Sequence, residues 1–322
     1  MGVSALIQSA PSKLILCGEH AVVYGQPALA VPLGDLRAYA EVSAGTPGSG
    51  LSFVAPDLGE AWDAHVKPEH PLSELALALL ASFGITQADL VLRLHAEIPL
   101  ASGMGSGAAI GTALVRALAA WFDQELPPAQ IADLVYASER RFHGTPSGID
   151  NTVVAHEQAI WYVRHLTPAA QGFTATIEPV VMNAPLHLVI GDTGVRSMTR
   201  LPVGAVREAW QADPPRYEAF FAAIGQVVHR VRTALSEGDQ QQLGALFNEN
   251  QALLQEIGVS SPELNHLVAA ARQAGALGAK LSGAGWGGVM FALVTPDQRS
   301  TVTQALHKAG ATRVIATTVA SS

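Results

Sequence analysis

A loop of small residues, Pro99-Leu-Ala-Ser-Gly-Met-Gly-Ser-Gly-Ala-Ala109, leads directly into the apolar residues 110–122. Only Arg116 is charged between Ala108 and Phe122, so this segment predicts a helix buried on most sides. A helix N-terminus has unpaired N–H groups and a partial positive charge, and both attract anions. We therefore predict a phosphate-binding loop, although these residues alone also fit a tight turn that packs a helix against a strand. The candidate phosphate contacts are Ser102, Gly103, Gly105, Ser106 and Gly107.

The composition indicates a folded globular chain. With 322 residues, of which 49% are hydrophobic, there is enough apolar material for two domains or one large domain. A net charge of −8 without a basic cluster argues against nucleic-acid binding. The single cysteine, Cys17, excludes an internal disulfide framework and a cysteine-based zinc cluster. Because no leader-like segment and no apolar run of about 18 residues is present, we expect a cytoplasmic protein without a membrane span.

Periodicity and punctuation predict an α+β fold in two parts. In the first part we expect strands at 3–17, 36–54, 90–98 and 159–163, and helices at 73–83, 110–122 and 128–142. The polar, proline-containing residues 167–185 predict a boundary between a domain of residues 1–180 and a domain of residues 181–322. In the second part we expect strands at 186–190, 289–294 and 313–319, and helices near 203–211, 215–236, 239–257, 262–275 and 301–309. This order fits a sheet with helices packed on one face.

Three further stretches contain residues that could do chemistry. Lys13, one of only four lysines, precedes a short apolar strand, where a lysine is either a solvated edge charge or part of a site. His143-Gly-Thr-Pro-Ser-Gly-Ile-Asp-Asn151 is a loop of turn-forming residues, and its last two residues could act simply as an N-cap. Lys280-Leu-Ser-Gly-Ala-Gly-Trp-Gly-Gly288 is a second glycine-rich loop, for which a hairpin turn is the simpler interpretation.

Together these motifs resemble a known family. Lys13-Leu-Ile-Leu-Cys-Gly-Glu-His-Ala-Val-Val-Tyr-Gly-Gln-Pro-Ala-Leu29, Pro99-Leu-Ala-Ser-Gly-Met-Gly-Ser-Gly-Ala-Ala109 and the loop at 280–288 resemble the three signature motifs of the GHMP small-molecule kinases. Within that superfamily, the residues at 18–25 and 143–151 resemble the mevalonate kinase form. The resemblance covers nearly the full length. It implies an N-terminal domain like ribosomal protein S5 domain 2, a C-terminal ferredoxin-like α/β sandwich, and an active site in the cleft.

The resemblance also implies the reaction and its residues. We expect phosphorylation of the 5-hydroxyl of mevalonate by ATP with Mg²⁺, with Asp150 as the catalytic carboxylate and Lys13 close to it in the family arrangement. Glu139, with Ser106, is the expected metal ligand, because it precedes Asp150 by the family's separation of eleven residues. The expected nucleotide-binding residues are Pro99, Ala101, Ser102, Gly103, Met104, Gly105, Ser106, Gly107 and Ala108. The expected substrate residues are Glu19, His20, Gly148, Thr193, Arg196, Thr199, Gly283 and Ala284.

Two positions depart from the family pattern. Gly107 stands where the family usually has a second serine that is assigned to Mg²⁺ and the phosphates, so either Ser106 replaces it or Glu139 and water complete the metal shell. Trp286 stands where the family generally has glycine, which predicts a bulky wall beside the nucleotide or substrate.

Other functions on the same scaffold stay open at this point. The chain could phosphorylate phosphomevalonate, homoserine or the 3-hydroxyl of mevalonate, or it could be a silent sensor that binds such ligands without catalysis. The presence of Lys13, Glu139 and Asp150 together argues against a sensor, because binding alone does not require all three. The sequence does not fix the oligomeric state, and a homodimer is the assembly we name as an expectation.

Overall fold

The computed structural model describes residues 5–99, 102–143, 147–167, 172–197 and 199–321. Contacts divide the chain into two compact units that alternate along the sequence. The first unit comprises Met1–Ser12, Gly34–Pro99 and Gly105–Glu157, and the second comprises Lys13–Leu33, Leu100–Met104 and Gln158–Ser322. Two long strands, β1 (Leu6–Cys17) and β2 (Pro27–Ala44), contribute one part to each unit. The predicted domains, 1–180 and 181–322, are two continuous stretches of the chain, whereas each of these units is made of separate segments. The predicted domain boundary stays a prediction.

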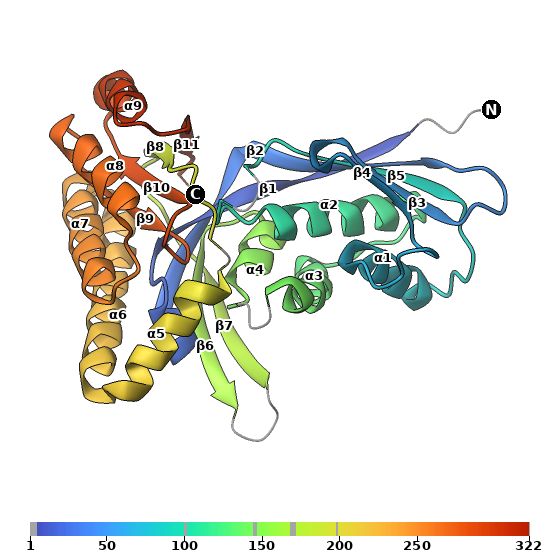
Figure 1. The fold of residues 1–322 in the computed structure, drawn as a ribbon, viewed down its shortest axis with the longest axis horizontal. Coiled ribbons are helices and arrows are strands. Elements are labelled where there is room, and N and C mark those ends of the chain that lie inside the picture. Colours follow the sequence, from blue (N-terminus) through green and yellow to red (C-terminus); the bar gives the residue numbers. More distant parts are fainter. Residues whose placement is uncertain (1–4, 100–101, 144–146, 168–171, 198, 322) are drawn as a thin grey trace. The chain divides into compact units, whose positions relative to one another are not determined.

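The first unit combines a part of a sheet with four helices (Figure 1). The second half of β2 pairs antiparallel with β5 (Leu90–Ala96), which pairs parallel with β3 (Leu51–Ala55), and β3 pairs antiparallel with β4 (Glu60–Asp63). The register places Tyr39 opposite His95 and Phe53 opposite Trp62. The helices, which contact one another, are α1 (Pro71–Ser82), α2 (Ser106–Trp121), α3 (Pro128–His143) and α4 (Ile149–His156).

Helix α2 forms the centre of this unit. The predicted buried helix is confirmed: Ala108, Leu114 and Leu118 are fully buried, and α2 contacts α1, α3, α4 and β5. Its alanines and glycines allow three helices to approach it closely, and each buried leucine contributes about 1.5–3 kcal/mol of hydrophobic stabilisation. The N-terminus of α2 is therefore held firmly in place, which is what an anion site at that end requires.

Among the residues that the structure describes, the second unit contains two sets of strands and five α-helices. The first half of β2 pairs antiparallel with β6 (Ile160–Thr167), which pairs antiparallel with β7 (Gly172–Pro179). A separate antiparallel sheet has the order β11 (Arg313–Val319), β8 (Leu186–Asp192), β10 (Val289–Leu293), β9 (Gly278–Ser282). The helices are α5 (Arg200–Ala212), α6 (Pro214–Glu237), α7 (Gln240–Glu256), α8 (Pro262–Gln273) and α9 (Arg299–Lys308). Between α7 and β10, Phe247 and Phe291 pack edge to face, with ring centroids 5.1 Å apart.

Side chains of two helices cover the open edge of β9. Asn248 Oδ1 accepts a hydrogen bond from Ala279 N at 3.1 Å, and Gln251 Oε1 accepts one from Leu281 N at 2.9 Å. Arg272 of α8 donates to Ala279 O at 2.7 Å. Edge strands present unpaired backbone groups, and here polar side chains take the place of a neighbouring strand. The strand that carries the third motif is thereby fixed on both sides.

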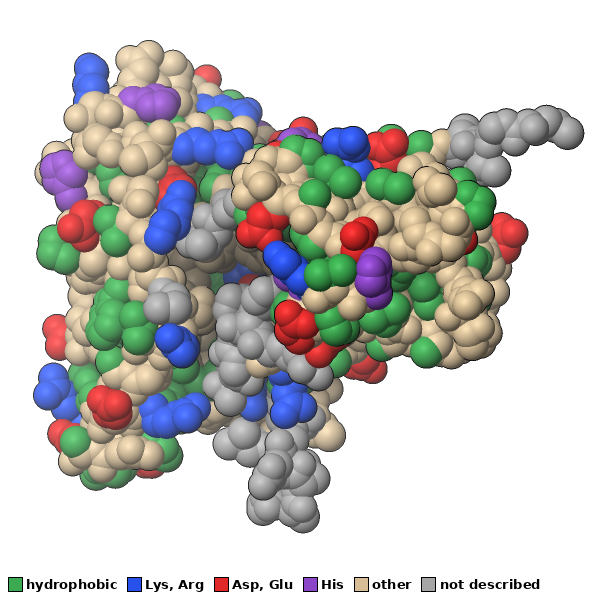
Figure 2. Space-filling model, turned by 45° about the vertical axis from the view of Figure 1, so that its right-hand side comes forward, with side chains coloured by type: hydrophobic (Ala, Val, Ile, Leu, Met, Phe, Trp, Pro, Cys, Tyr) green, Lys and Arg blue, Asp and Glu red, His purple; other side chains and the backbone are tan. Residues whose placement is uncertain are grey.

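The expected α+β fold is confirmed, but four of the described α-helices and strands were not predicted. Strand β4 is only four residues long, which is too short to show an alternating pattern. Helix α4 is only eight residues long and lies between left-handed residues at Gly148 and Glu157, so its hydrophobic period is too short to detect. Strand β7 falls in the polar stretch interpreted as a boundary, and β9 in the loop at 277–288. No helix in the part of the chain that the structure describes is long and apolar enough to cross a membrane. On the face in Figure 2, Lys and Arg side chains are scattered among other types rather than gathered into a stripe.

Candidate active site

The predicted phosphate loop ends at the N-terminus of α2. Gly105 is the N-cap residue in the left-handed conformation (φ 74°), and as a glycine it has no side chain with which to cap the helix. The first turn contains no acidic residue, so nothing within α2 neutralises its partial positive charge. Ser102 and Met104, which belong to the second unit, are buried, and Ala101 lies outside the described residues. This end of α2 has the features of an anion-binding site.

Glu139 of α3 lies against this end of α2. A Cβ atom added to Gly107 would lie only 2.5 Å from Glu139 Oε1, and the Glu139 side chain is 7% exposed. The absence of a side chain at 107 thus makes room for the carboxylate, which also benefits from the helix dipole. A carboxylate oxygen is the kind of ligand that Mg²⁺ prefers, so Glu139 fits the expected metal at a phosphate site. One contact thus accounts both for the glycine where the family usually has serine and for the position of Glu139, because the carboxylate occupies the space that a side chain at 107 would fill.

Asp150 lies in the first turn of α4, half-buried. Gly148, not Asp150, is the N-cap residue, with φ 91°, so the simple capping role does not apply to Asp150. Helix α4 is fixed by Thr152 Oγ1, which donates to Gly148 O at 2.6 Å, and by the Asn151 amide, which donates to Ala132 O of α3 at 3.0 Å. Asp150 and Glu139 therefore lie on two helices that pack directly together.

Lys13 belongs to the second unit. Its side chain is 2% exposed, so the alternative of a solvated edge charge is excluded. The Lys13 N–H donates to Met104 O at 3.1 Å, which ties β1 to the start of the glycine loop. A buried lysine must interact with other groups to remain charged, and this suits a residue of a site.

Glu19 and Lys280 form a fully buried ion pair between the first and third motifs. Lys280 Nζ donates to Glu19 Oε1 and, at 2.6 Å, to Leu281 O. Burial raises the pKa of the Glu19 carboxyl, and the Lys280 ammonium opposes that rise. Glu19 Oε2 has no hydrogen-bond partner among the described residues. The structure thus gives Glu19 a structural partner, while its predicted contact with substrate stays a prediction.

His20 connects the same two motifs. Its ring Nε2 lies 2.9 Å from Ala284 O, so Nε2 carries the proton and donates. Burial lowers the pKa of His20 to about 4, which keeps the imidazole neutral at pH 7. The residue has a positive φ of 61°, which is uncommon outside glycine. Together with the ion pair, this bond fixes the turn after β1 against the third loop.

The predicted substrate residues on the segment after β8 are engaged within the protein. Thr193 Oγ1 donates to Gly288 O at 2.8 Å and accepts from Val195 N at 3.2 Å. Arg196 binds Asp192 through two hydrogen bonds of 2.7 and 2.8 Å. Asp192 is buried, and it raises the pKa of the Arg196 guanidinium. Thr199, the residue before α5, is exposed. Their predicted contacts with substrate stay predictions.

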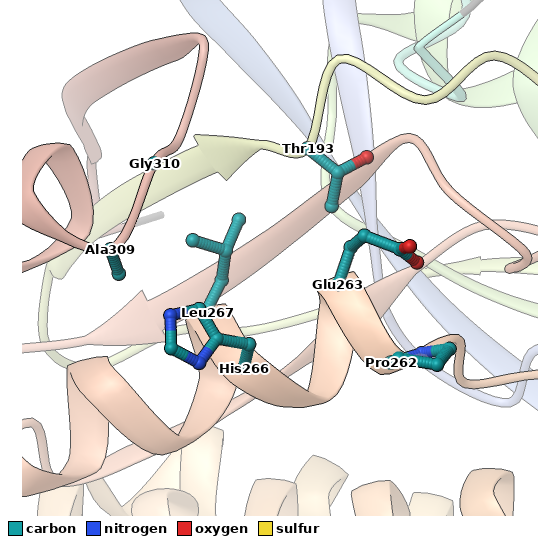
Figure 3. Close-up of a pocket in the computed structure, with 7 residues that line it drawn as sticks. All are labelled: Thr193, Pro262, Glu263, His266, Leu267, Ala309 and Gly310. Carbon is teal, nitrogen blue, oxygen red and sulfur yellow. The ribbon is translucent and has the colours of Figure 1, made fainter.

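A cavity of about 310 Å³ in the second unit includes Thr193 (Figure 3). Its walls come from the end of β8, the first turns of α8 and the turn after α9. Glu263 and His266 line it, but they point in different directions, and both are exposed to solvent. A small-molecule site normally brings several polar groups together around one ligand. We therefore do not assign substrate binding to this cavity.

The third glycine loop lies against the start of the phosphate loop. A Cβ atom at Gly288 would lie 2.7 Å from Ser102 O, and one at Gly283 would lie 3.6 Å from Gly103 O. Ser282 Oγ donates to Ile15 O at 3.0 Å and accepts from Ile15 N at 3.1 Å. Ser282, Lys280 and Asp192 were not among the predicted site residues. The scarcity of lysine was the one sequence signal that singled out Lys280.

Comparisons with known proteins agree with these features. The model of the GHMP kinases N terminal domain matches residues 71–157, and the model of the GHMP kinases C terminal region matches residues 231–312. A mevalonate kinase of Thermococcus sibiricus is 34% identical over 330 residues, covering 96% of this chain and 95% of that protein. The chain belongs to the mevalonate kinase family. A mevalonate kinase of Pyrococcus abyssi is also 34% identical, over 96% of this chain and 94% of its own length.

A solved structure extends the similarity to the fold. The crystal structure of L. major mevalonate kinase in complex with R-mevalonate matches with a TM-score of 0.83 and 29% identity, covering 99% of this chain and 97% of that one. The resemblance inferred from the three motifs is thus confirmed, as is the two-domain GHMP kinase fold. As a member of this family, the chain is an enzyme of the kinase class.

Adding a side chain at Gly107 should be tolerated by the fold but should displace Glu139. In Gly107→Ser the close neighbour is the end of a flexible side chain, whereas in Gly288→Ala it is a backbone oxygen, at a residue with φ 74°. We expect Gly107→Ser to keep a thermal unfolding midpoint within a few degrees of wild type, and Gly288→Ala to lose about 1–3 kcal/mol of stability. Calorimetry measures both, and an equally large loss in Gly107→Ser would show that Glu139 cannot move.

Removing one partner of the buried ion pair should be costly. Lys280→Met leaves Glu19 buried without its cation, which destabilises a protein by about 3–5 kcal/mol. The double variant Lys280→Met with Glu19→Gln should recover much of that loss, because no buried charge remains. Urea unfolding of both variants and of the surface control Lys308→Met measures this. Additive single and double effects would contradict the coupling.

Proposed function

We propose that the chain transfers the γ-phosphoryl group of ATP to the 5-hydroxyl of mevalonate, giving 5-phosphomevalonate. Membership of the mevalonate kinase family supports the activity. The observation that carries the chemistry is the placement of Glu139 against Gly107, which puts a hard oxygen ligand at the N-terminus of a helix suited to phosphate.

The nucleotide side of the site comes from the glycine loop. The N–H groups at the start of α2 bind phosphate oxygens, and Ser106 adds a hydroxyl. Glu139 and Ser106 would hold Mg²⁺, which would supply positive charge to neutralise the phosphates. The described residues contain no group of three or more metal-ligating side chains, and Mg²⁺ with a nucleotide usually needs only one or two carboxylates because phosphates and water complete its shell.

Two charged residues act on the transfer itself. Asp150 accepts a hydrogen bond from the substrate hydroxyl, orients it for in-line attack and takes its proton as the bond to phosphorus forms. Lys13 stabilises negative charge on the transferring phosphoryl group. Phosphoryl transfer depends mainly on positioning and charge neutralisation, so orientation by Asp150 contributes more than its basicity.

The remaining assignments concern the substrate-binding residues, the cellular location and the oligomeric state. Gly148, His20, Gly283 and Ala284 supply the walls and backbone groups around the substrate. Thr193 and Arg196, which bind Gly288 and Asp192 in the structure, are also assigned to the substrate side of the site. We also propose a cytoplasmic location and a homodimeric assembly.

Asp150→Asn should fold normally and lose turnover by several orders of magnitude, because the neutral amide holds the substrate hydroxyl less firmly for in-line attack and cannot take its proton. The assay combines Mg·ATP with (R)-mevalonate, follows ADP release and locates the new phosphate by phosphorus NMR. The matched control is Asp133→Asn, an exposed residue of α3. Wild-type turnover in Asp150→Asn would remove the residue from the mechanism, and phosphate on the 3-hydroxyl would overturn the proposed regiochemistry.

Glu139→Gln should raise the Mg²⁺ concentration needed for half-maximal activity, by about tenfold or more, since a neutral amide oxygen is a weaker ligand for this cation. Titration of Mg²⁺ at fixed ATP measures the change, with the exposed Glu125→Gln as the control. An unchanged magnesium titration would exclude Glu139 as a direct ligand.

A further inference from the structure

Trp286 has a strained backbone conformation. Its φ is 57°, in the left-handed region that a bulky aromatic residue rarely adopts. Such a conformation is unfavourable for a bulky residue and persists only where surrounding contacts impose it. Its neighbours Gly285 and Gly287 also have positive φ, but glycine adopts such angles without this penalty. Something other than intrinsic preference must therefore hold Trp286.

Two hydrogen bonds from Trp286 oppose the strain. Its backbone N–H donates to Val259 O at 2.9 Å, and its indole Nε1 donates to Gly258 O, also at 2.9 Å. Both acceptors belong to the turn between α7 and α8. The side chain is 38% exposed, so the indole covers the turn while one side of it faces solvent. The indole bond is available only to tryptophan among the aromatic hydrophobic residues.

The loop that Trp286 holds is packed on several sides. Gly285 lies against Val259 O, Gly287 against Val195 O, and Gly288 against Ser102 O, each so closely that an added Cβ atom would collide. On its other side, Ala284 O accepts the hydrogen bond from His20. A shift of the loop at Trp286 would therefore be transmitted to Ser102, at the start of the phosphate loop.

We propose that Trp286 is a positioning residue, whose indole bond to Gly258 holds the third loop in the conformation that supports the phosphate loop. The kinetic part of this inference rests on the proposed kinase function. When the bond is lost, the loop becomes less ordered in the free protein. Part of the free energy of ATP binding must then be used to order it, so the KM for ATP rises. One hydrogen bond contributes about 0.5–1.5 kcal/mol, which corresponds to an increase of about 2- to 10-fold. The KM for mevalonate and kcat change less.

Two substitutions separate the bond from the bulk of the side chain. Trp286→Phe keeps the strained backbone and the ring but lacks the donor. Trp286→Gly lacks the donor as well, but it removes the strain, so its effect should be smaller than that of Trp286→Phe. Trp210→Phe is the matched control, because Trp210 Nε1 is buried in the second unit and has no hydrogen-bond partner among the residues described.

Two readouts test the proposal. Hydrogen exchange of the amides at 284–288 should be several-fold faster in Trp286→Phe than in wild type or Trp210→Phe, and the KM for ATP should rise in parallel. Exchange and KM equal to wild type in Trp286→Phe would overturn the proposal, as would a larger effect in Trp286→Gly, since bulk rather than the bond would then matter. Hydrogen exchange needs no catalysis, so an inactive wild-type enzyme would count against the proposed function alone.

Discussion

The second unit depends on one buried ion pair, between Glu19 and Lys280. Taking two charges out of water is expensive, and the pair is tolerable only because each charge has the other close by and Lys280 also donates to Leu281 O. Apolar residues could fill this space at less cost in free energy. What the pair adds is geometry: it joins the turn after β1 to the strand that leads into the third loop. The bonds of His20 to Ala284 and of Ser282 to Ile15 repeat the same connection with neutral groups.

The chemistry of the first unit uses helix ends in a similar way. Helices α2 and α4 both begin after a left-handed glycine, Gly105 or Gly148, and neither is capped by the side chain of its N-cap residue. Each has a carboxylate near its start: Glu139 comes from a neighbouring helix, and Asp150 lies in the first turn. The positive ends of helices attract negatively charged groups. The same fields favour phosphate, so the acids and the nucleotide share one source of electrostatic stabilisation.

Much of the fold, and the candidate residues of the site, could be predicted from the sequence because they depend on local patterns and on family motifs. The burial of α2 follows from a long run with a single charge. Glu139 was singled out as a metal ligand because its spacing from Asp150 matches the family, and that role stays a prediction. Partners far apart along the chain could not be predicted: nothing in the sequence pairs His20 with Ala284, or Lys280 with Glu19. The short helix α4 was missed because eight residues show too little of a helical period. Trp286 was recognised as unusual, but its left-handed backbone depends on an acceptor supplied by another segment.

Strand β9 illustrates how a functional motif can be kept from unwanted association. A short, fully buried strand at the rim of a sheet would normally be open to pairing with a strand of another molecule. Asn248 and Gln251 occupy the donors that such a strand would need, and Arg272 occupies an acceptor. Polar side chains of α7 and α8 therefore block the pairing of β9 with a strand of another molecule. A chain that presents a glycine-rich loop next to this edge can then keep the loop accessible to ligand without also offering a template for aggregation.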